Sequence, residues 1–327
     1  MGLEIGKVGF IQPVLEGLKR AGVNQQTLTC KSGLDRFNLD DPENYVPVNA
    51  MYRFLALVRK QEGITEFLET FSDQLHLASL SQWGEMIVHT SDVLTACRTA
   101  EKFNHLLLSH EQSGLETNGS TSRYWQRFTD KPAEGREQAD FISFALAMSG
   151  FRLAGGPDWS PIEIHLQSNS VPNLDMYLAP GSNTRILSGQ PETAIVFPTA
   201  MLAMPMLGEG APSGLSDCCT SGDAGLAGKI RQLLDSINPD LQPVINLVSA
   251  MSDSSQRTLQ RKLADEGTSF SEVVDQWRFT TAVQLLSDPG MRVKDISERL
   301  FYSNVPNFER AFRRWTNTSP NRYRDMQ

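Results

Sequence analysis

Apolar residues recur every three or four positions in several segments of the first half of the chain. This spacing places them on one side of a helix, so it predicts helices over residues 8–23, 48–63, 91–107 and 140–154. The residues expected to face a core from the helix over 91–107 are Val93, Leu94, Cys97, Ala100 and Phe103. Shorter segments rich in β-branched and aromatic residues are predicted strands: 121–129, 162–168 and 193–198. We therefore expect a mixed α+β domain over residues 1–204.

The last hundred residues carry a denser helical pattern. Two amphipathic stretches predict helices over 224–237 and 241–251. Ser254 or Ser255 can then cap a further helix, because a serine oxygen accepts a hydrogen bond from a free backbone N–H of the first turn. Leu259 and Leu263 form the inward pair of that helix. A short helix, a turn and a second helix with a polar outer face predict a helix-turn-helix unit at about 241–265.

A second unit of the same kind follows a long helix. Ser269 and Glu272 form a capping box that begins a helix running over 269–286. The residues expected to face inward from it are Phe270, Val273, Val274, Trp277, Thr281 and Leu285. The pattern of short helix, turn and longer helix then repeats at about 293–315. The longer helix carries a stripe with the spacing of a buried helix face: Phe308, Ala311, Phe312 and Trp315. This predicts an all-α domain with two helix-turn-helix units joined by a long helix.

Between the two parts lies a stretch rich in glycine, serine and proline, residues 205–225, as is typical of a linker. The charge balance changes there as well. Residues 226–327 hold 14 basic and 12 acidic residues, a net charge of +2, whereas the preceding residues hold 16 and 26, a net charge of −10. We therefore predict a regulatory domain at 1–204, the linker, and a helical domain at 226–327. Cys218 and Cys219 fall in the linker and are expected to be unpaired.

Composition and motifs argue against several classes of function. Apolar residues make up 40% of the chain and charged residues 21%, as in soluble globular proteins. The longest apolar stretch, at 141–151, is too short to span a bilayer, and the first residues do not form a signal peptide, so we expect a cytoplasmic location and no membrane partner. The histidines and cysteines lack metal-site spacing, and no nucleotide-binding or nucleophile motif occurs. No catalytic residue, metal or cofactor is therefore expected.

The end of the chain is basic and aromatic, although the whole chain has a net charge of −8. Residues 299–324 carry six arginines and one acid, and the aromatic residues among them are expected to hold the helices together. Asn304 and Ser319 can cap two helices of this segment. Its arginines form either a solvated surface or a face for nucleic acid. Two helix-turn-helix units favour the second interpretation.

Four segments of the C-terminal part carry a resemblance to a known family: "SSQRTLQRKLADEGTSF", "RFTTAVQLL", "VKDISERL" and "FERAFRRWTNTSPNRYR". Residues 226–327 resemble the DNA-binding domain of the AraC/XylS family of bacterial transcription regulators. The first part, with "DWSPIEIHLQS" and its early helices, resembles the ligand-binding domain of a subgroup that includes regulators responding to amino acids or other small metabolites. The chain departs from the family pattern at Phe301 and Asn317, where the family usually has glycine. Asn317 tolerates a left-handed backbone, whereas Phe301 is expected to require a different turn or to shift the second reading helix.

The resemblance implies that each helix-turn-helix unit places one helix in the major groove of DNA. Arg257, Gln260 and Arg261 of the first unit match base-reading positions, and arginine suits guanine while glutamine suits adenine. The matching positions of the second unit are Val305, Pro306, Asn307 and Arg310. Arg313 and Arg314 are better suited to phosphate contacts, which position the protein without reading sequence.

We therefore predict a sequence-specific DNA-binding transcription regulator controlled by a small molecule bound to its first domain. Four aromatic residues are candidates for lining the effector site, although core packing is their more usual role: Trp83, Tyr124, Trp125 and Trp159. Expected partners are double-stranded operator DNA, RNA polymerase, a small effector and a second copy of the chain. Activation is the working expectation, although the sequence leaves the sign of regulation open. Two alternatives are a ligand-independent regulator controlled by a protein partner, and an enzyme domain fused to a DNA-binding module.

Overall fold

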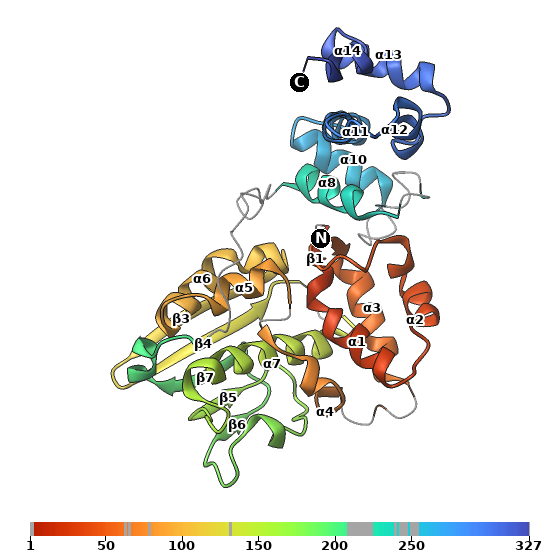
Figure 1. Ribbon diagram of the computed structural model, residues 1–327. Helices are drawn as coiled ribbons and strands as arrows, with labels where there is room; N and C mark the ends of the chain where they lie inside the picture. Colours follow the sequence, from red (N-terminus) through yellow and green to blue (C-terminus); the bar gives the residue numbers. More distant parts are fainter. Residues whose placement is uncertain are drawn as a thin grey trace. The chain divides into compact units, whose positions relative to one another are not determined.

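The computed structural model describes residues 3–61, 64, 67–77, 80–130, 133–207, 225–238, 241, 248 and 255–326. The chain forms two compact units, Met1–Gly222 and Asp223–Gln327, whose elements are labelled in Figure 1. The first unit combines helices with sheets, and the described part of the second is helical, which confirms the predicted fold class. Several predicted features fall largely outside the described residues: the linker at 205–225, the helix over 241–251, and Cys218 and Cys219. The predicted domain boundaries stay predictions.

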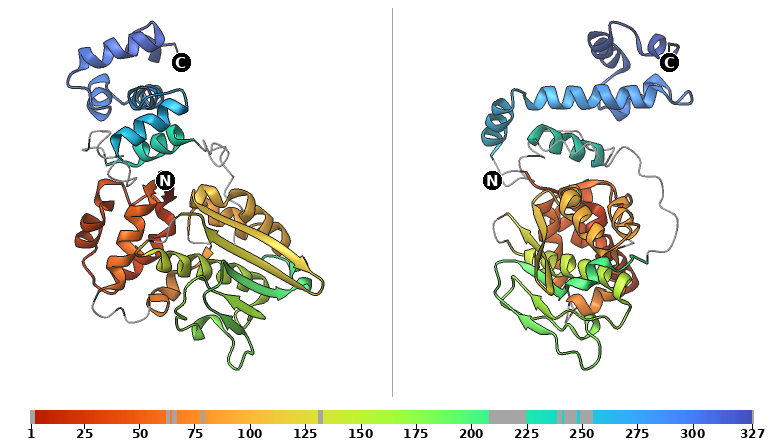
Figure 2. Two further views of the ribbon diagram at one scale, coloured as in Figure 1. Left: turned by 180° about the vertical axis from the view of Figure 1, so that it is seen from behind. Right: turned by 90° about the vertical axis from the view of Figure 1, so that its left-hand side faces the viewer.

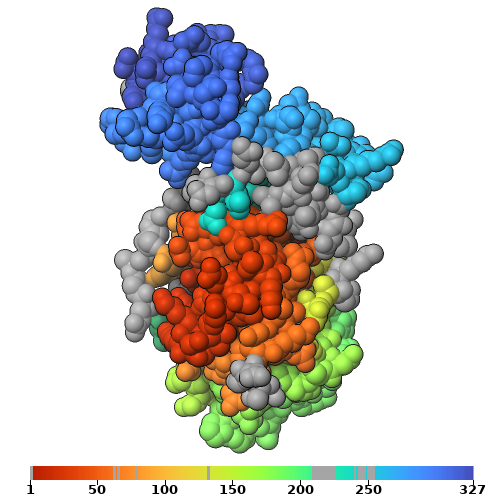
Figure 3. Space-filling model, turned by 90° about the vertical axis from the view of Figure 1, so that its right-hand side faces the viewer, coloured from red at the N-terminus to blue at the C-terminus, as the bar shows by residue number. Residues whose placement is uncertain are grey.

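The N-terminal unit begins with a helical part built beside a small sheet. Strands β1 (Ile5–Lys7) and β2 (Tyr45–Pro47) pair in antiparallel fashion. The four helices of this part are α1 (Gln12–Arg20), α2 (Gln25–Ser32), α3 (Val48–Arg59) and α4 (Phe67–Phe71). Residues of the first three helices form one continuous red-to-orange surface in Figure 3. Helix α3 packs against α2 and against α7 (Arg136–Gly155), so it links this part to the larger sheet.

The larger sheet has five strands in the order β3-β4-β7-β5-β6. Their bounds are β3 Glu111–Asn118, β4 Thr121–Phe128, β5 Glu163–His165, β6 Arg185–Leu187 and β7 Thr193–Pro198. Neighbouring strands are antiparallel, apart from β5 and β6, which run parallel. The tight turn between β3 and β4 contains Gly119 at φ +60°, a conformation that glycine adopts without strain. This order brings residues from distant parts of the sequence onto the same sheet face.

One face of this sheet is covered by helices. Glu111, Ser113 and Leu115 alternate along β3 toward that face, and all three are buried. Helix α6 (Val93–Leu107) packs against β3, α7 packs against β7, and α5 (Gln82–Val88) packs against α6. The covered face is therefore the part of the unit that can enclose a small molecule.

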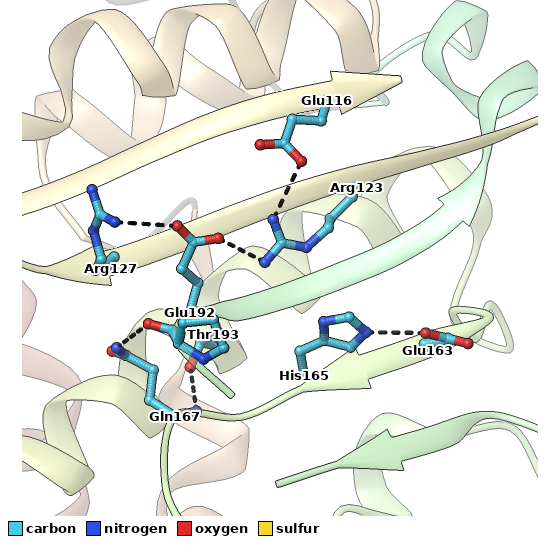
Figure 4. Close-up of polar contacts among 9 residues, drawn as sticks. Glu116, Arg123, Arg127, Glu163, His165, Gln167, Glu192 and Thr193 are labelled. Atoms are coloured by element: carbon cyan, nitrogen blue, oxygen red, sulfur yellow. Dashed lines mark hydrogen bonds and ion pairs between the residues drawn. The ribbon is translucent and has the colours of Figure 1, made fainter. Parts of the chain in front are cut away.

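The opposite face of the sheet carries charged side chains, shown in Figure 4. Its contacts join Arg123 to Glu116 and Glu192, Arg127 to Glu192, and His165 to Glu163. The tightest of them, between Arg123 Nη2 and Glu192 Oε2, measures 2.7 Å. Ion pairs at a solvated surface typically contribute only about 0–1 kcal/mol each. Because the arginine and glutamate side chains of this face pair with one another, they account for its polar surface without a bound ligand.

The predicted helices and strands of the first part are present with shifted ends. The sequence prediction did not include strands β1, β2, β3 and β6. One expectation is wrong: the inner face of α6 is rotated from the predicted one, because Leu94 is 43% exposed and Phe103 is half-buried. The buried face instead follows Val93 at helical spacing, three, four, seven, eleven and fourteen residues later: Ala96, Cys97, Ala100, Asn104 and Leu107. A polar residue, Asn104, therefore occupies a core position.

The described part of the C-terminal unit consists of six helices. They are α8 (Leu226–Ser236), α10 (Gln256–Asp265), α11 (Phe270–Leu286), α12 (Val293–Arg299), α13 (Val305–Thr316) and α14 (Pro320–Arg324). Ser269 and Glu272 form the predicted reciprocal capping box at the start of α11. In Figure 2, α11 extends between α10 at one end and α13 and α14 toward the other. No helix in the described residues is long and apolar enough to span a bilayer.

Two polar contacts tie α8 to the helices that follow it. The Glu266 carboxylate accepts hydrogen bonds from the backbone N–H groups of Leu226 and Ala227, at 2.7 and 3.0 Å. These bonds satisfy donors that a helix start otherwise leaves free. The indole N–H of Trp277 donates to Asp235 at 2.8 Å. Helices α8, α10 and α11 therefore share one small core.

Candidate nucleic-acid interface and effector cavity

Helix α10 exposes the residues predicted to read DNA in the first unit. The sequence predicted Ser254 or Ser255 as the cap of this helix, and Ser255 is the residue that accepts the backbone hydrogen bond. Leu259 and Leu263 are buried, which turns the opposite side of the helix outward. Three predicted contact residues are exposed on that side: Arg257, Gln260 and Arg261. Their spacing gives one polar surface about a helical turn long.

The turn between α12 and α13 closes around Phe301. Its N–H donates to the carbonyl of Glu298 and the N–H of Tyr302 donates to that of Ser297, both at 3.0 Å. This pair of hydrogen bonds is typical of a helix that ends at a residue with a left-handed backbone. At the end of α12 that residue is Phe301, with φ +59°. The different turn expected at this position is therefore not formed, because phenylalanine adopts the backbone that glycine would supply. Asn317 ends α13 at φ +56°, as predicted for it.

We expect Phe301→Gly to be more stable than Phe301→Ala by about 1 kcal/mol. Both variants lose the phenylalanine ring, but only glycine also removes the left-handed strain, which costs about 1–2 kcal/mol in other residues. At most positions the alanine variant is the more stable of the two, because glycine gains more conformational freedom than alanine in the unfolded chain. Urea unfolding of the two variants measures the difference. A more stable alanine variant would show that the backbone at this position is not strained.

Helix α13 is anchored by three buried residues of its predicted stripe: Phe308, Ala311 and Phe312. Asn304 caps the helix, since its side chain accepts the N–H of Asn307 at 2.9 Å. The residues at the predicted base-reading positions are exposed or half-buried: Val305, Pro306, Asn307 and Arg310. The Asn307 side chain donates to Ser303 at 2.7 Å and accepts from Arg310. The polar residues of this helix start are therefore already ordered by one another.

The arginines of α13 make surface contacts that DNA phosphates can replace. Arg314 pairs with Asp275 of α11 at 2.7 Å, and Arg313 pairs with Glu309 of its own helix at 3.5 Å. Both arginine side chains are more than half exposed. Ion pairs of this kind are weak in water. Both guanidinium groups are therefore accessible to solvent, and their predicted phosphate contacts stay a prediction.

Other arginines of this unit have structural partners. Arg278 donates to the carbonyl of Leu300 at 3.1 Å and lies over the ring of Tyr302 at 4.8 Å. Arg324 donates to the carbonyl of Leu286 at 3.2 Å and also binds that of Met291. These bonds connect α11 to the segments that follow it. Part of the C-terminal basic charge therefore holds the second helix-turn-helix unit in place.

Some residues predicted to face the core of the C-terminal unit are only half-buried: Phe270, Thr281, Leu285 and Trp315. In α11 the buried positions near its end are Ala282 and Leu286, one residue later than predicted. Trp315 packs edge-on against the rings of Phe279 and Phe312 at 5.8 and 6.2 Å. The stripe of α13 therefore ends at Phe312, with Trp315 at its margin.

The N-terminal unit contains a cavity of about 50 Å³ between the large sheet and its covering helices. Its walls come from α5, α6 and α7, from β3 and β4, from Phe10 and Leu77, and from Met206. Most of the wall is apolar and includes Phe10, Ile87, Leu107, Leu146 and Phe151. One water-sized sphere needs about 10–15 Å³, so the cavity holds only a few small groups.

Polar side chains interrupt this apolar wall. Glu111 of β3, Asn104 of α6 and Ser143 of α7 line the cavity and are 5%, 2% and 3% exposed. Within the described residues, Glu111 Oε1, Ser143 Oγ and both amide atoms of Asn104 lack a hydrogen bond of good geometry. An unpaired buried polar atom costs about 1–3 kcal/mol, so most such atoms in proteins are paired. The arrangement provides a polar end for a molecule that enters the cavity.

The cavity includes two of the four aromatic residues suggested by the sequence. Trp83 and Tyr124 lie in its wall. Trp125 follows Tyr124 on β4 and points to the opposite face of the sheet, and Trp159 stacks on Phe151 at 5.4 Å. Sequence reasoning missed Asn104 and Glu111. The sequence feature that could have identified Asn104 as a cavity residue is the position of this polar residue on the apolar face of a predicted helix.

The carboxyl groups near the cavity have shifted pKa values. Burial raises the pKa of Glu111 to about 8, opposed by Ser143 and Asn104 and increased by the charge of Asp140. Burial also raises the pKa of Asp140 to about 6, against the effect of its hydrogen bond from Thr193. A raised carboxyl pKa means that the folded state holds its proton more tightly than the unfolded chain. Stability therefore falls as pH rises, from 4.5 to about 8 for Glu111 and from 3.8 to about 6 for Asp140.

Between pH 6 and 8, the melting temperature of the N-terminal unit should fall by several degrees through the Glu111 carboxyl. Glu111→Gln cannot ionise, so its profile should be flatter over this range. Glu116→Gln, at an exposed position of the same strand, is the matched control and should keep the wild-type slope. Calorimetry of the full chain gives all three profiles. Equal slopes would show that Glu111 does not titrate in the folded protein.

The α12–turn–α13 arrangement, with α10 as a second exposed polar helix, defines a DNA-binding protein of the helix-turn-helix class. Two family models match this chain: "Helix-turn-helix domain" over residues 248–326, and "Arabinose-binding domain of AraC transcription regulator, N-term" over residues 22–206. The second match covers more than half of the chain. The protein therefore belongs to the AraC family of transcription regulators, which confirms the resemblance seen in the sequence.

Individual relatives are similar mainly over the C-terminal part. An uncharacterised helix-turn-helix-type regulator of Mycobacterium tuberculosis is 42% identical over 83 residues, which are 25% of this chain and 24% of that protein. VqsM of Pseudomonas aeruginosa is 39% identical over 101 residues, 31% of each chain. The ornithine utilization regulator of the same species is 33% identical over 101 residues, 31% of this chain and 30% of that one. The matches thus span about a quarter to a third of these relatives. The solved structure of CdpR from Pseudomonas aeruginosa aligns over 96% of this chain and 97% of its own, at 22% identity and a TM-score of 0.44.

Proposed function

We propose that the protein binds specific DNA sites as a transcription regulator and that a small molecule in its N-terminal unit controls this binding. The observation that carries the proposal is the pair of helices α10 and α13. Each buries an apolar side in the C-terminal unit and exposes arginine and other polar side chains on the opposite side. Helices of this kind fit the major groove, where side chains reach the base edges.

The exposed residues take different roles in this proposal. Arg257, Gln260 and Arg261 read bases, because arginine and glutamine pair with guanine and adenine through two hydrogen bonds. The second reading helix uses Val305, Pro306, Asn307 and Arg310, with apolar contacts from the first two. Arg313 and Arg314 bind phosphates and set the position of the protein on the duplex.

Residues 204–206 connect the cavity to the DNA-binding unit. The N–H of Val93, at the start of α6, donates to the carbonyl of Met204 at 3.0 Å. Both Val93 and Met206 line the cavity, and the chain then continues through 208–224 toward α8. A ligand that shifts α6 or Met206 therefore shifts the point from which the chain leaves the N-terminal unit. Control also requires the ligand to favour one state over another.

Operator DNA and the effector are the main proposed partners. RNA polymerase and a second copy of the chain follow from a role in transcription, and the proposed location is the cytoplasm. Within the described residues the cavity wall holds one carboxyl group, Glu111, and not the pair of carboxyl groups that some hydrolases use, since Asp140 is bonded to Thr193 by both oxygens and lies outside the wall. The relatives are named as regulators as well. These observations favour a sensor over a fused enzyme.

Selection from a pool of random DNA duplexes should yield a defined operator for the full chain. Binding to it should weaken steeply with salt, because each phosphate contact releases counterions. With about six such contacts, affinity falls roughly a thousandfold between 50 and 200 mM salt. Gel-shift or anisotropy titrations measure this slope. The absence of an enriched sequence, together with salt-independent binding, would contradict the proposed DNA-reading function.

The ligand-independent alternative is tested on the same operator. A metabolite screen by thermal shift identifies molecules that stabilise the full chain. A ligand that controls the regulator should change operator affinity by about 5–150-fold, the usual range of coupling between two sites. Unchanged operator affinity and unchanged transcription at saturating ligand would favour a regulator controlled by a protein partner.

A further inference from the structure

The polar end of the cavity has a specific chemical character. Glu111 contributes a buried carboxyl whose Oε1 has no hydrogen bond of good geometry, and the Asn104 and Ser143 side chains lie close enough to this carboxyl to lower its pKa. The residues that line the cavity in the described part of the chain include no lysine, arginine or histidine. A buried carboxylate is costly unless a cation or several hydrogen bonds accompany it. The described wall therefore offers this acidic group no basic side chain, and its ionised form would be stabilised by a cation brought in by a ligand.

We propose that the cavity binds a compact aliphatic amine, with its ammonium group on Glu111 and its alkyl chain on the apolar wall. The proposal rests on the sensing function proposed above and specifies the chemistry of the effector. An ammonium group donates three hydrogen bonds and accepts none. Glu111, the Asn104 carbonyl and the Ser143 hydroxyl can supply the three acceptors. The cavity volume suits an amine of about four or five non-hydrogen atoms.

The same wall argues against other effector classes. A free amino acid would bring a carboxylate into a cavity whose described lining has no basic side chain to pair with it. A sugar would bury several hydroxyl groups against mainly apolar residues, and each unpaired hydroxyl is costly. The description of the matching family model names arabinose, but a cavity of about 50 Å³ is too small for a pentose, which has about twice the number of non-hydrogen atoms that fit there. An alcohol fits in shape but brings no positive charge that would favour the ionised form of the Glu111 carboxyl.

Binding of the amine has a proton balance that can be measured. Near pH 7 an alkylamine carries its proton, as a lysine side chain does. Burial raises the pKa of the Glu111 carboxyl to about 8, so near pH 7 most of it is protonated before an amine binds. Pairing with the ammonium group requires the carboxylate, so the Glu111 proton passes to the buffer while the amine keeps its own. About one proton should be released for each amine bound.

The experiment is calorimetric titration of the full chain at pH 7 with n-butylamine, n-butanol and n-butyrate. These probes have similar alkyl chains and differ in the charge of the head group. Butylamine should bind at least about tenfold more tightly than the other two, because a charge-assisted hydrogen bond is stronger than a neutral one. Repeating the titration in buffers of different ionisation enthalpy should give the release of about one proton.

Variants separate the role of Glu111 from general damage to the fold. Glu111→Gln should lower butylamine affinity at least about tenfold and leave butanol binding unchanged. Glu116→Gln, on the exposed side of β3, should bind butylamine as the wild type does. Ala100 lines the cavity, so Ala100→Leu should reduce butylamine binding by filling the space, and it provides a test if the glutamine variant does not fold.

Three outcomes would overturn the proposal: no butylamine binding, equal binding of all three probes, or full binding by both Glu111→Gln and Ala100→Leu. A preference for butyrate that Arg152→Met removes would instead place the ligand in a second depression of about 410 Å³, which Arg152 and Tyr177 line. None of these results bears on operator selection and its salt dependence. Failure of the amine proposal is therefore distinguishable from failure of the proposed DNA-binding function.

Discussion

Phe312→Ala is expected to unfold the C-terminal unit and to abolish operator binding. The Phe312 side chain is 0% exposed, and its ring meets those of Phe308, Trp315 and Tyr323 at 5.7, 6.2 and 5.4 Å. It therefore joins the core of α13 to the last helix. Truncating a buried phenylalanine to alanine typically costs about 3–5 kcal/mol. Whole domains are stable by only about 5–15 kcal/mol, so little stability would remain.

Calorimetry and circular dichroism of the full chain measure this effect. The melting transition of the C-terminal unit should move down steeply or disappear, while that of the N-terminal unit stays in place. Arg313→Ala, on the exposed side of the same helix, is the control and should leave both transitions near their wild-type temperatures. An unchanged C-terminal transition in Phe312→Ala would mean that the core does not depend on this ring.

Arg261→Ala is expected to weaken binding to the preferred operator by about 5–150-fold and to relax base choice at one position. Loss of a bidentate contact between arginine and a base costs about 1–3 kcal/mol, which corresponds to this range. The exposed position of Arg261 on α10 leaves its guanidinium group available for such a contact. Binding to unrelated DNA should change much less, because base contacts are not made there.

Arg314→Ala provides the matched comparison. A phosphate contact adds affinity on every sequence, so this variant should weaken operator and unrelated DNA by similar factors. Its salt slope should also become shallower by about one contact. Affinities over a set of operators with single base changes separate the two behaviours. If both variants lose affinity uniformly over the whole set, the division between base-reading and phosphate-binding arginines is wrong.

The C-terminal unit was predictable in detail because its signals are local. A capping box, serine and asparagine caps and apolar stripes each act within one helical turn. The errors lie at the margins of helices, as with Trp315 and Leu285, where exposure depends on neighbouring helices that the periodicity does not specify. The family resemblance indicated the base-reading positions, and exposure of their side chains is compatible with that assignment.

The N-terminal cavity could not be predicted in the same way. Buried and exposed residues alternate at the start of strand β3, but two of the buried ones are the polar residues Glu111 and Ser113. The alternation of apolar and polar residues by which strands are usually predicted is therefore missing. Asn104 similarly replaces an apolar residue on the inner face of α6. These groups meet Ser143 only through the sheet order and the packing of α7. Their shared location depends on tertiary structure, which no short sequence pattern contains.

The left-handed backbone at Phe301 also limits which mutations can improve this turn. No single-nucleotide change converts a phenylalanine codon into a glycine codon. The one-step intermediates on that route encode valine or cysteine, and each would still have to adopt φ near +59°. Valine is worse suited to that conformation than phenylalanine, because its side chain branches at the β-carbon. Two nucleotide changes therefore separate Phe301 from glycine, and neither one-step intermediate removes the strain of the left-handed backbone.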